Sequence, residues 1–380
     1  MKTPFEQFNE PVSAVASPTV NSQTGRVSIP APLEGERARI AFPAAIPASE
    51  LGSGEHFNWV WEGYAAKGHS CLLTGLPKAG KSTLLGHLLA KSCDGGELVG
   101  RVEPAQVLVV AEEGAGLWAR RRDDLVIGDN VRFLIRPFMS KPYRPEWEGF
   151  IEYVTDLVVA ESFDLVVFDT FSSISPLRDE NDAGRMLEAL LPLHQITNEG
   201  ASLLLVHHPR KSDAGEGQAS RGSGALPGWV DVIIELRRFS AEDRSDTRRT
   251  LTTYSRFDES PDEAVIELTP DGYQHVGSKR DAKQSDRMEI IGEILTSGLP
   301  GLTPVEVRDQ WTGFDVPKPG QRVVYGDLQE GYTRGSWQRS GEGKRGDPYR
   351  YFLGSVSILA CSPSLGAGNE YEGCEGGSDA

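Results

Sequence analysis

Five short apolar runs, separated by stretches with helical spacing, constrain the fold of this chain more than any other feature of its sequence. Each run reads as a strand, because it is apolar and is bounded by polar or turn-forming residues. The runs are SCLLT (70–74), QVLVVA (106–111), DLVVF (164–168), SLLLV (202–206) and VDVIIEL (230–236). Strands that alternate with helices are typical of βαβ units. The sequence therefore predicts an α/β fold with a mainly parallel central sheet.

Two later runs extend this pattern. TLTTYS (250–255) and AVIELT (264–269) are predicted to form an antiparallel extension, joined through the turn at 259–263. Pro192 lies inside the helix-like segment 184–196. Its ring and its missing N–H should kink that helix or end it early.

The chain has 380 residues, which is enough for two folded units. Residues 1–50 are rich in Pro, Ser and Ala and are predicted to be a disordered arm. The α/β domain is assigned to 51–276, a polar linker without an apolar face to 277–285, and a second domain to 286–361. Residues 362–380 form a Gly/Ser/Glu tail, which is also predicted to be disordered.

Composition restricts the classes of partner. No run approaches 18 apolar residues, so no membrane span is expected, and the first 20 residues have no apolar h-region behind their single lysine, so no signal peptide is expected. The cysteines, which are Cys71, Cys93, Cys361 and Cys374, lack metal-ligand spacing and favour a reducing, cytoplasmic location. A net charge of −16 disfavours broad attachment to nucleic acid, although it leaves room for a local basic channel.

The segment 75–82 fits the pattern GxxxxGK[ST] at every fixed position, between the strand 70–74 and a predicted helix at 81–92. Glycines let backbone N–H groups surround a phosphate, and a helix N-terminus adds positive potential. Lys81 can reach the β- and γ-phosphates, and the Ser82 hydroxyl can ligate Mg²⁺. The predicted nucleoside triphosphate site comprises Gly75, Leu76, Pro77, Lys78, Ala79, Gly80, Lys81, Ser82 and Thr83.

Acidic residues follow two other strands. Asp169 ends the run 164–168, where its carboxylate can orient Mg²⁺, or it can simply cap a turn. Glu112 and Glu113 end the run 106–111, where one of them can polarise the attacking water, unless the pair forms a solvated acidic turn.

The run 202–206 ends in His207 and His208. If this strand lies beside the one that carries Asp169, one histidine can contact the terminal phosphate while the other faces the opposite side of the sheet. Alternatively, the two are hydrogen-bonded core histidines. The following segment, 213–226, is too rich in Gly and Ser to pack alone and is expected to be mobile. Its neighbourhood carries three candidate contacts to nucleic acid, which are Arg210, Lys211 and Arg221.

This pattern resembles the RecA-like AAA-type ATPases close to the plasmid RepA hexameric helicases and, more distantly, the DnaB-type helicases. The resemblance covers residues 57–267. It rests on PKAGKST (77–83), AEEG (111–114), VVFDTFSSI (166–174), RDENDAGRM (178–186), HHPRK (207–211) and SRGSGAL (220–226). It implies a RecA-like P-loop fold that binds ATP and Mg²⁺, in a ring that encloses single-stranded DNA.

The resemblance also implies roles for individual residues. Glu112 corresponds to the catalytic glutamate, Asp169 to the Walker B aspartate and His208 to the histidine that senses the γ-phosphate. The loop 210–224 would face single-stranded DNA in the central channel. The segment 179–183 follows the Walker B strand in the family, and it also reads as a turn and helix cap.

The chain departs from the RepA-type pattern after the RGS segment, where Asp231 stands in place of an arginine. This arrangement is similar to the DnaB-type strand, whose arginine finger lies further on. Arg256 is then the first candidate finger and Arg221 the second. Such an arginine acts on a neighbouring subunit, so a homo-oligomer is expected, in the form of a hexameric ring or a filament.

The C-terminal segment predicts three helices followed by a β-ribbon. The first helix is expected at 287–295, and Thr303, Pro304 and Glu306 form a helix-start signal. A third helix at 320–330 precedes two strands around a Gly-rich turn. This order suggests a winged-helix-like α+β domain.

Its candidate contacts to duplex DNA are Arg322, Arg339, Lys344 and Arg345, on a recognition helix and a wing. Protein contact or oligomerisation is the alternative use of this domain. The whole chain is predicted to be an ATPase that couples hydrolysis to DNA binding or translocation. The alternatives are an ATP-gated DNA-binding regulator and an ATP-dependent scaffold for protein assembly.

Overall fold

The computed structural model describes residues 57–208, 224–240, 243, 245–295 and 300–354, together with 19–20, 27–28, 45 and 47–50. It divides into two compact units between His56 and Phe57. In the first unit, β1 (Thr19–Val20) pairs antiparallel with β2 (Val27–Ser28). Most of the predicted arm 1–50 and the whole tail 362–380 lie outside the described residues.

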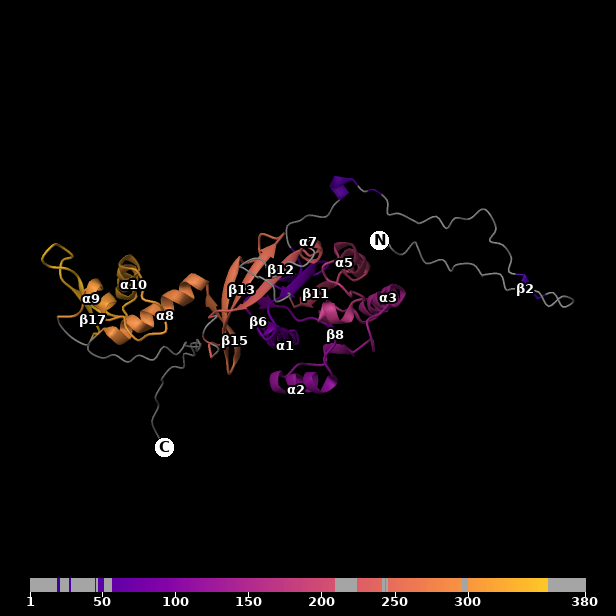
Figure 1. Cartoon of the computed structure of the whole chain (residues 1–380), viewed down its shortest axis with the longest axis horizontal. Coiled ribbons are helices and arrows are strands. Elements are labelled where there is room, and N and C mark those ends of the chain that lie inside the picture. Colours follow the sequence, from indigo (N-terminus) through magenta and orange to yellow (C-terminus); the bar gives the residue numbers. More distant parts are fainter. Residues whose placement is uncertain are drawn as a thin grey trace, which may run out of the picture. The chain divides into compact units, whose positions relative to one another are not determined.

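A nine-stranded sheet forms the centre of the second unit, in the order β15-β14-β13-β12-β5-β11-β10-β8-β9. Figure 1 labels β8, β11, β12, β13 and β15 of this sheet. Each of the five predicted runs is a strand, and β9 adds a sixth beside β8. These strands are β5 (Ser70–Thr74), β8 (Val107–Ala111), β9 (Val131–Ile135), β10 (Leu165–Asp169), β11 (Ser202–His207) and β12 (Val232–Arg238). From β12 to β9 every pairing is parallel, which confirms the predicted mainly parallel sheet.

The antiparallel extension is also present. It consists of β13 (Arg248–Ser255), β14 (Glu263–Thr269) and β15 (Gly272–Gly277). All three pair antiparallel, beginning with β13 on β12. The extension therefore brings residues near 248 to the edge of the sheet at which β5 and β12 end.

Two hydrophobic layers cover the two faces of the sheet, because successive side chains of a strand point to opposite faces. Leu73 packs with α1 (Lys81–Lys91) and α2 (Ala115–Leu125) on one face. The adjacent Leu72 packs on the other face. The helices of that second face are α3 (Arg144–Glu161), α4 (Phe171–Ile174), α5 (Ala183–Leu190), α6 (His194–Asn198) and α7 (Ala225–Trp229).

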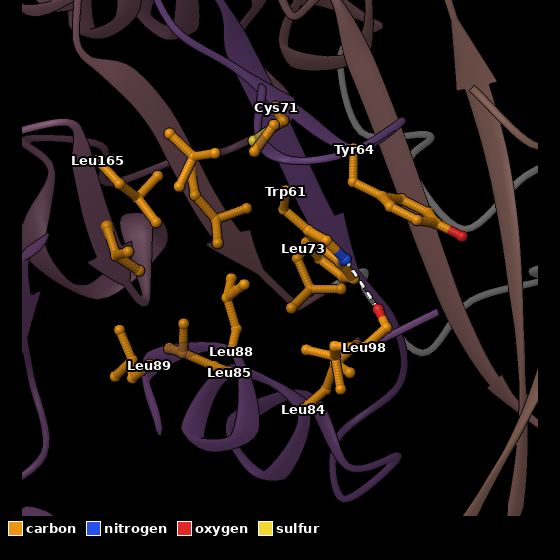
Figure 2. Packing of buried hydrophobic residues seen from close by; sticks show 14 of the residues in the cluster. Trp61, Tyr64, Cys71, Leu73, Leu84, Leu85, Leu88, Leu89, Leu98 and Leu165 are labelled. Atoms are coloured by element: carbon orange, nitrogen blue, oxygen red, sulfur yellow. Dashed lines mark hydrogen bonds between the residues drawn. The ribbon is translucent and has the colours of Figure 1, made fainter. Parts of the chain in front are cut away.

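Figure 2 shows the first layer, in which Leu84, Leu85, Leu88 and Leu89 of α1 lie against the sheet. Each of these leucines is at most 1% exposed, and burial of one contributes about 1.5–3 kcal/mol. The layer fixes α1 on the sheet and so fixes the turn that precedes it.

A small four-stranded sheet, which the sequence patterns did not predict, borders this layer. Its strands are β4 (Ala65–Ala66), β3 (Trp59–Trp61), β7 (Arg101–Val102) and β6 (Gly96–Glu97). Trp61 is anchored by a hydrogen bond of 2.9 Å from its indole Nε1 to the Leu98 carbonyl oxygen (Figure 2). Strands of two or three residues are too short to show a period of two.

Pro192 interrupts the helical segment as predicted. Helix α5 ends at Leu190, a 3₁₀ turn covers Leu191–Leu193, and α6 begins at His194. Asp182 caps α5 through its side chain, which accepts a hydrogen bond from the Arg185 N–H. The interpretation of residues 179–183 as a turn and helix cap is therefore confirmed.

The C-terminal part contains α8 (Lys279–Ile294), α9 (Pro304–Asp309), α10 (Gln321–Thr333) and the antiparallel pair β16 (Gln338–Ser340) and β17 (Arg350–Phe352). They share a core of their own, with Ile291, Val324 and Tyr351 fully buried. The predicted capping box of Thr303 and Glu306, with Pro304 in the first turn, is present.

One predicted boundary is wrong. Residues 277–285 were expected to be a linker without an apolar face, but Lys279 begins α8 and Ala282 is fully buried. A capping box between Ser278 and Asp281 starts this helix earlier than its apolar spacing suggested. Among the described residues, no helix is long and apolar enough to cross a membrane.

Candidate nucleotide-binding site

The GxxxxGK[ST] segment joins the end of β5 to the start of α1, as predicted. Two of its glycines are required by their surroundings. A Cβ atom on Gly75 would lie 2.4 Å from the Leu236 carbonyl oxygen, so a side chain cannot be accommodated. Gly80 forms the N-cap of α1 with φ of 110°, a backbone conformation that favours glycine. The loop therefore packs closely on β12, and glycine at both positions lets its backbone follow the tight turn that a phosphate-binding loop needs.

Lys81, which is 4% exposed, lies over this loop. Its Nζ donates to the carbonyl oxygens of Gly75 at 2.5 Å and Leu76 at 3.2 Å, and lies 2.8 Å from His208 Nδ1. Burial lowers the pKa of Lys81 to about 8, and the Asp169 carboxylate opposes this effect. The structure thus places one buried cation where the sequence predicts the polyphosphate.

Asp169 ends β10, with the parallel strands β8 and β11 on either side. It is 3% exposed, and its Oδ2 has no hydrogen-bond partner among the described residues. Burial, together with the nearby Glu113 carboxylate, raises the pKa of Asp169 to about 6. A buried carboxylate oxygen with a free lone pair fits a cation, so Asp169 and the Ser82 hydroxyl suit Mg²⁺.

The unusual pKa of Asp169 predicts that Asp169→Asn stabilises the nucleotide-free protein at neutral pH. The native carboxyl group holds its proton up to about pH 6, whereas the unfolded chain releases it near 3.8. Folding stability therefore falls as pH rises through that window, by on the order of 3 kcal/mol. Thermal unfolding should show a higher Tm for the variant at about pH 8 and converging values toward pH 4. Equal Tm values at pH 8 would contradict the conclusion that burial raises the pKa of Asp169.

The two glutamates after β8 differ in their contacts. Glu113 forms an ion pair with Arg121 of α2. Glu112 accepts a hydrogen bond of 3.2 Å from the Thr170 hydroxyl, and its backbone N–H donates to the Asp169 carbonyl oxygen at 2.9 Å. Partial burial raises the pKa of Glu112, and the bond from Thr170 opposes this effect. Glu113 is therefore paired with a cation, whereas no ion pair is found for the Glu112 carboxylate within the described residues.

A pocket of about 360 Å³ adjoins Glu112. Arg136 and Lys141 line it, and the Arg136 Nε donates to the Glu112 carbonyl oxygen at 3.0 Å. Lys141 is held by the carbonyl oxygens of Ser172 and Ser175. Both cations favour the ionised form of Glu112.

His207 ends β11 and His208 follows it, and the two side chains have different neighbours, as the alternation along an extended segment predicts. His208 lies beside Lys81, and burial lowers its pKa, with the Lys81 charge adding to the effect. The Nε2 of His207 lies 3.4 Å from a Glu180 carboxylate oxygen. His208 is thus the histidine on the phosphate side. The loop that follows it, with Arg210, Lys211 and Arg221, lies outside the described residues.

Arg256 does not join this site. It follows β13 at the opposite edge of the sheet, where it pairs with Asp231 at 2.9 Å, and Asp231 also accepts a hydrogen bond from the Ser70 N–H at the start of β5. The length of β5 places that edge roughly 15 Å from the chain's own phosphate loop. The Arg256 side chain is 62% exposed.

The candidate DNA contacts of the C-terminal part differ in availability. Arg339 is packed between two tyrosines, with its guanidinium carbon 4.1 Å from the ring centroids of Tyr332 and Tyr349, and it donates to Gln329. It therefore supports the β-ribbon instead of forming a free wing cation. Lys344 pairs with Glu342 at 2.6 Å. Arg322 and Arg345 are exposed.

Sequence patterns missed three polar residues of the site. Thr170 was missed although it follows Asp169 directly, because a single hydroxyl after a strand carries little signal. Arg238 and Arg249 contact the phosphate loop from β12 and β13. Arg249 is 170 residues away from its contact, so no local pattern could have found it.

Part of the chain matches a known protein family. Residues 37–214 match the family model of the AAA domain. No curated protein matches the chain. Among solved structures, a KaiC-like protein from the hyperthermophilic archaeon Pyrococcus horikoshii OT3 is similar, with 19% identity and a TM-score of 0.41, over 55% of this chain and 90% of that one.

The parallel sheet and the phosphate loop between β5 and α1 fit a RecA-like P-loop fold, and the AAA-domain match over residues 37–214 supports an ATPase. Such a domain binds a nucleoside triphosphate with Mg²⁺. Among the described residues, no three His, Cys, Asp or Glu side chains gather as a metal cluster. A P-loop site needs none, because a hydroxyl, one carboxylate and the phosphates themselves supply the ligands.

Proposed function

We propose that this chain hydrolyses ATP and couples each turnover to the binding or movement of single-stranded DNA. The observation that carries the proposal is the position of His208. It touches the phosphate-site cation Lys81 at 2.8 Å and is followed at once by the segment that carries Arg210, Lys211 and Arg221. Loss of the γ-phosphate would therefore change the surroundings of His208, and the backbone joins His208 directly to the segment that carries these three cations.

The hydrolytic part of the proposal assigns one task to each residue. Lys81 and the loop N–H groups bind the β- and γ-phosphates. Ser82 and Asp169 hold Mg²⁺, which supplies neutralisation of phosphate charge when it is bound. Glu112 orients water and accepts its proton, while Thr170 fixes the direction of the Glu112 carboxylate.

Oligomerisation is part of the same proposal. Arg256 lies at the opposite edge of the sheet from its own phosphate loop and its side chain is 62% exposed. An arginine in that position can stabilise phosphate charge only on a neighbouring copy. This favours a head-to-tail assembly, a ring such as a hexamer or a filament, in which Asp231 holds Arg256 until the neighbour engages it.

We expect Arg221→Ala to separate ATP binding from DNA coupling. In the sequence Arg221 follows His208 and lies outside the GxxxxGK[ST] segment, so the Kd for MgATP should change less than about twofold while DNA stimulation of hydrolysis falls roughly tenfold. Nucleotide titration and steady-state hydrolysis with single-stranded DNA, both at fixed low salt, measure the two effects. DNA-stimulated turnover equal to that of the unmodified chain would remove this loop from the mechanism.

A second candidate function is ATP-dependent assembly of copies of this chain without action on DNA. It is favoured by a groove of about 630 Å³ on α9 and α10, where Val305 and Tyr325 are 47% and 44% exposed. Under this alternative, hydrolysis does not respond to DNA, and Tyr325→Asp reduces the mass of the ATP-bound complex in light scattering. A mass unchanged by Tyr325→Asp would reject it.

A further inference from the structure

Arginines from the end of β12 and the start of β13 contact the phosphate loop. Arg249 Nε donates to the Ala79 carbonyl oxygen at 2.8 Å. Arg238 makes a longer contact of 3.4 Å to the carbonyl oxygen of Lys78. Both carbonyl groups belong to the loop that is predicted to surround the phosphates.

The contact from Arg249 constrains one loop N–H group in particular. In a trans peptide unit the C=O bond and the following N–H bond point in opposite directions. A donor that holds the Ala79 carbonyl group therefore turns the Gly80 N–H away from Arg249. Phosphate loops need this orientation, because their N–H groups must converge on the anion.

Arg249 also keeps its charge next to the loop. Its Nη1 donates only to backbone carbonyl oxygens, those of Asp246 at 2.9 Å and Arg248 at 2.7 Å. Within the described ranges, no carboxylate lies at ion-pair distance from Arg249. The adjacent Arg248, in contrast, pairs with the carboxylates of Asp246 and Asp286. Two neighbouring arginines of one strand thus differ: one is neutralised, and the other supplies positive potential to the phosphate site.

The packing leaves Arg249 little freedom. A Cβ atom on Gly80 would lie 3.6 Å from the Arg249 Nε and 3.4 Å from the hydroxyl oxygen of Tyr273. Tyr273, in β15, makes an edge contact with His87 of α1, with ring centroids 5.2 Å apart. The antiparallel extension, the loop and α1 therefore meet around this guanidinium group.

We propose that Arg249 is a positioning residue of the phosphate site, which acts within its own subunit by fixing the Ala79–Gly80 peptide and adding positive charge behind the loop. The inference rests on the proposed binding of ATP. It gives the antiparallel extension, through Arg249 of β13, a role in that binding. Arg249 differs in this from Arg256, which is placed to act on a neighbour.

The test is calorimetric titration of the full chain with MgATP and, separately, with Mg-pyrophosphate, which lacks the nucleoside. Arg249→Gln should weaken the binding of both ligands roughly tenfold. The substitution removes a positive charge near the phosphates and the charged donor that holds the Ala79–Gly80 peptide. Arg249→Lys should restore part of this affinity. The matched control is Arg248→Gln, on the same strand, which should lower the Tm while changing neither affinity by more than about twofold. In steady state, Arg249→Gln should raise KM for ATP and leave kcat nearly unchanged.

Three outcomes would overturn the inference while leaving the ATP site intact: unchanged affinity in Arg249→Gln, a loss for MgATP that spares pyrophosphate, or an equal loss in Arg248→Gln. The second would place Arg249 at the nucleoside, and the third would trace the effect to general stability of the extension. An unmodified chain that binds neither ligand would reject the proposed ATP site and this inference together.

Discussion

Replacement of Glu112 by Gln is expected to reduce kcat for ATP hydrolysis by roughly 10²–10⁴-fold, with KM changed little. Glutamine keeps the shape of the side chain and can still accept a hydrogen bond from Thr170, but it cannot take a proton from water. The Glu112 carboxylate contacts Thr170, and the Glu112 backbone is hydrogen-bonded to Asp169. Glu112 therefore lies at the edge of the sheet where the attacking water is proposed to bind. The effect should therefore fall on the chemical step and spare ground-state binding.

Glu113→Gln is the matched control for this experiment. It removes the same charge one residue away, from a carboxylate that is paired with Arg121. Most of kcat should be retained in this variant. Single-turnover phosphate release separates the chemical step from binding in both variants. A Glu113→Gln loss that equals or exceeds the Glu112→Gln loss would transfer the role of base to Glu113.

Replacement of Lys81 by Ala is expected to lower kcat/KM by roughly 10³-fold, because the lysine supplies a buried cation over the phosphate loop. In Lys81→Ala, the affinity for MgATP should also no longer depend on pH in the alkaline range. In the unmodified chain the pKa of Lys81 is about 8, so MgATP binding should weaken as pH rises above that value and the ammonium group loses its proton.

Lys91→Ala provides the control, since Lys91 lies in the last turn of the same helix and is exposed. It should leave both kcat/KM and the pH profile of binding in place. A Lys81→Ala variant whose affinity for MgATP still falls above pH 8 would assign the titration to another group.

The parts of the site that sequence patterns predicted are those encoded in contiguous segments. The phosphate loop needs only glycines, Lys81 and Ser82 between a strand and a helix, and all of these lie within eight residues. Asp169 and His208 could be placed because each ends an apolar strand, and parallel strands bring their carboxyl ends to one edge.

The parts that were not predicted depend on contacts between distant segments. Arg249 lies on a strand of ordinary composition, and only the antiparallel return from β12 brings it to Ala79. Arg339 was predicted to contact DNA from its place on a wing, and its packing between the faces of Tyr332 and Tyr349 was not predicted. The helical start of α8 was missed because its first turns are polar, although the capping box of Ser278 and Asp281 was visible in the sequence.

The measurement that tests the central claim most directly is steady-state ATP hydrolysis by the full chain, with and without single-stranded DNA, at fixed low salt and with Lys81→Ala as the blank. The account predicts Mg²⁺-dependent hydrolysis well above the blank and a clear increase on addition of DNA. Hydrolysis that does not respond to DNA would contradict the proposed coupling and favour ATP-dependent assembly. A rate no higher than that of Lys81→Ala would contradict the catalytic site itself.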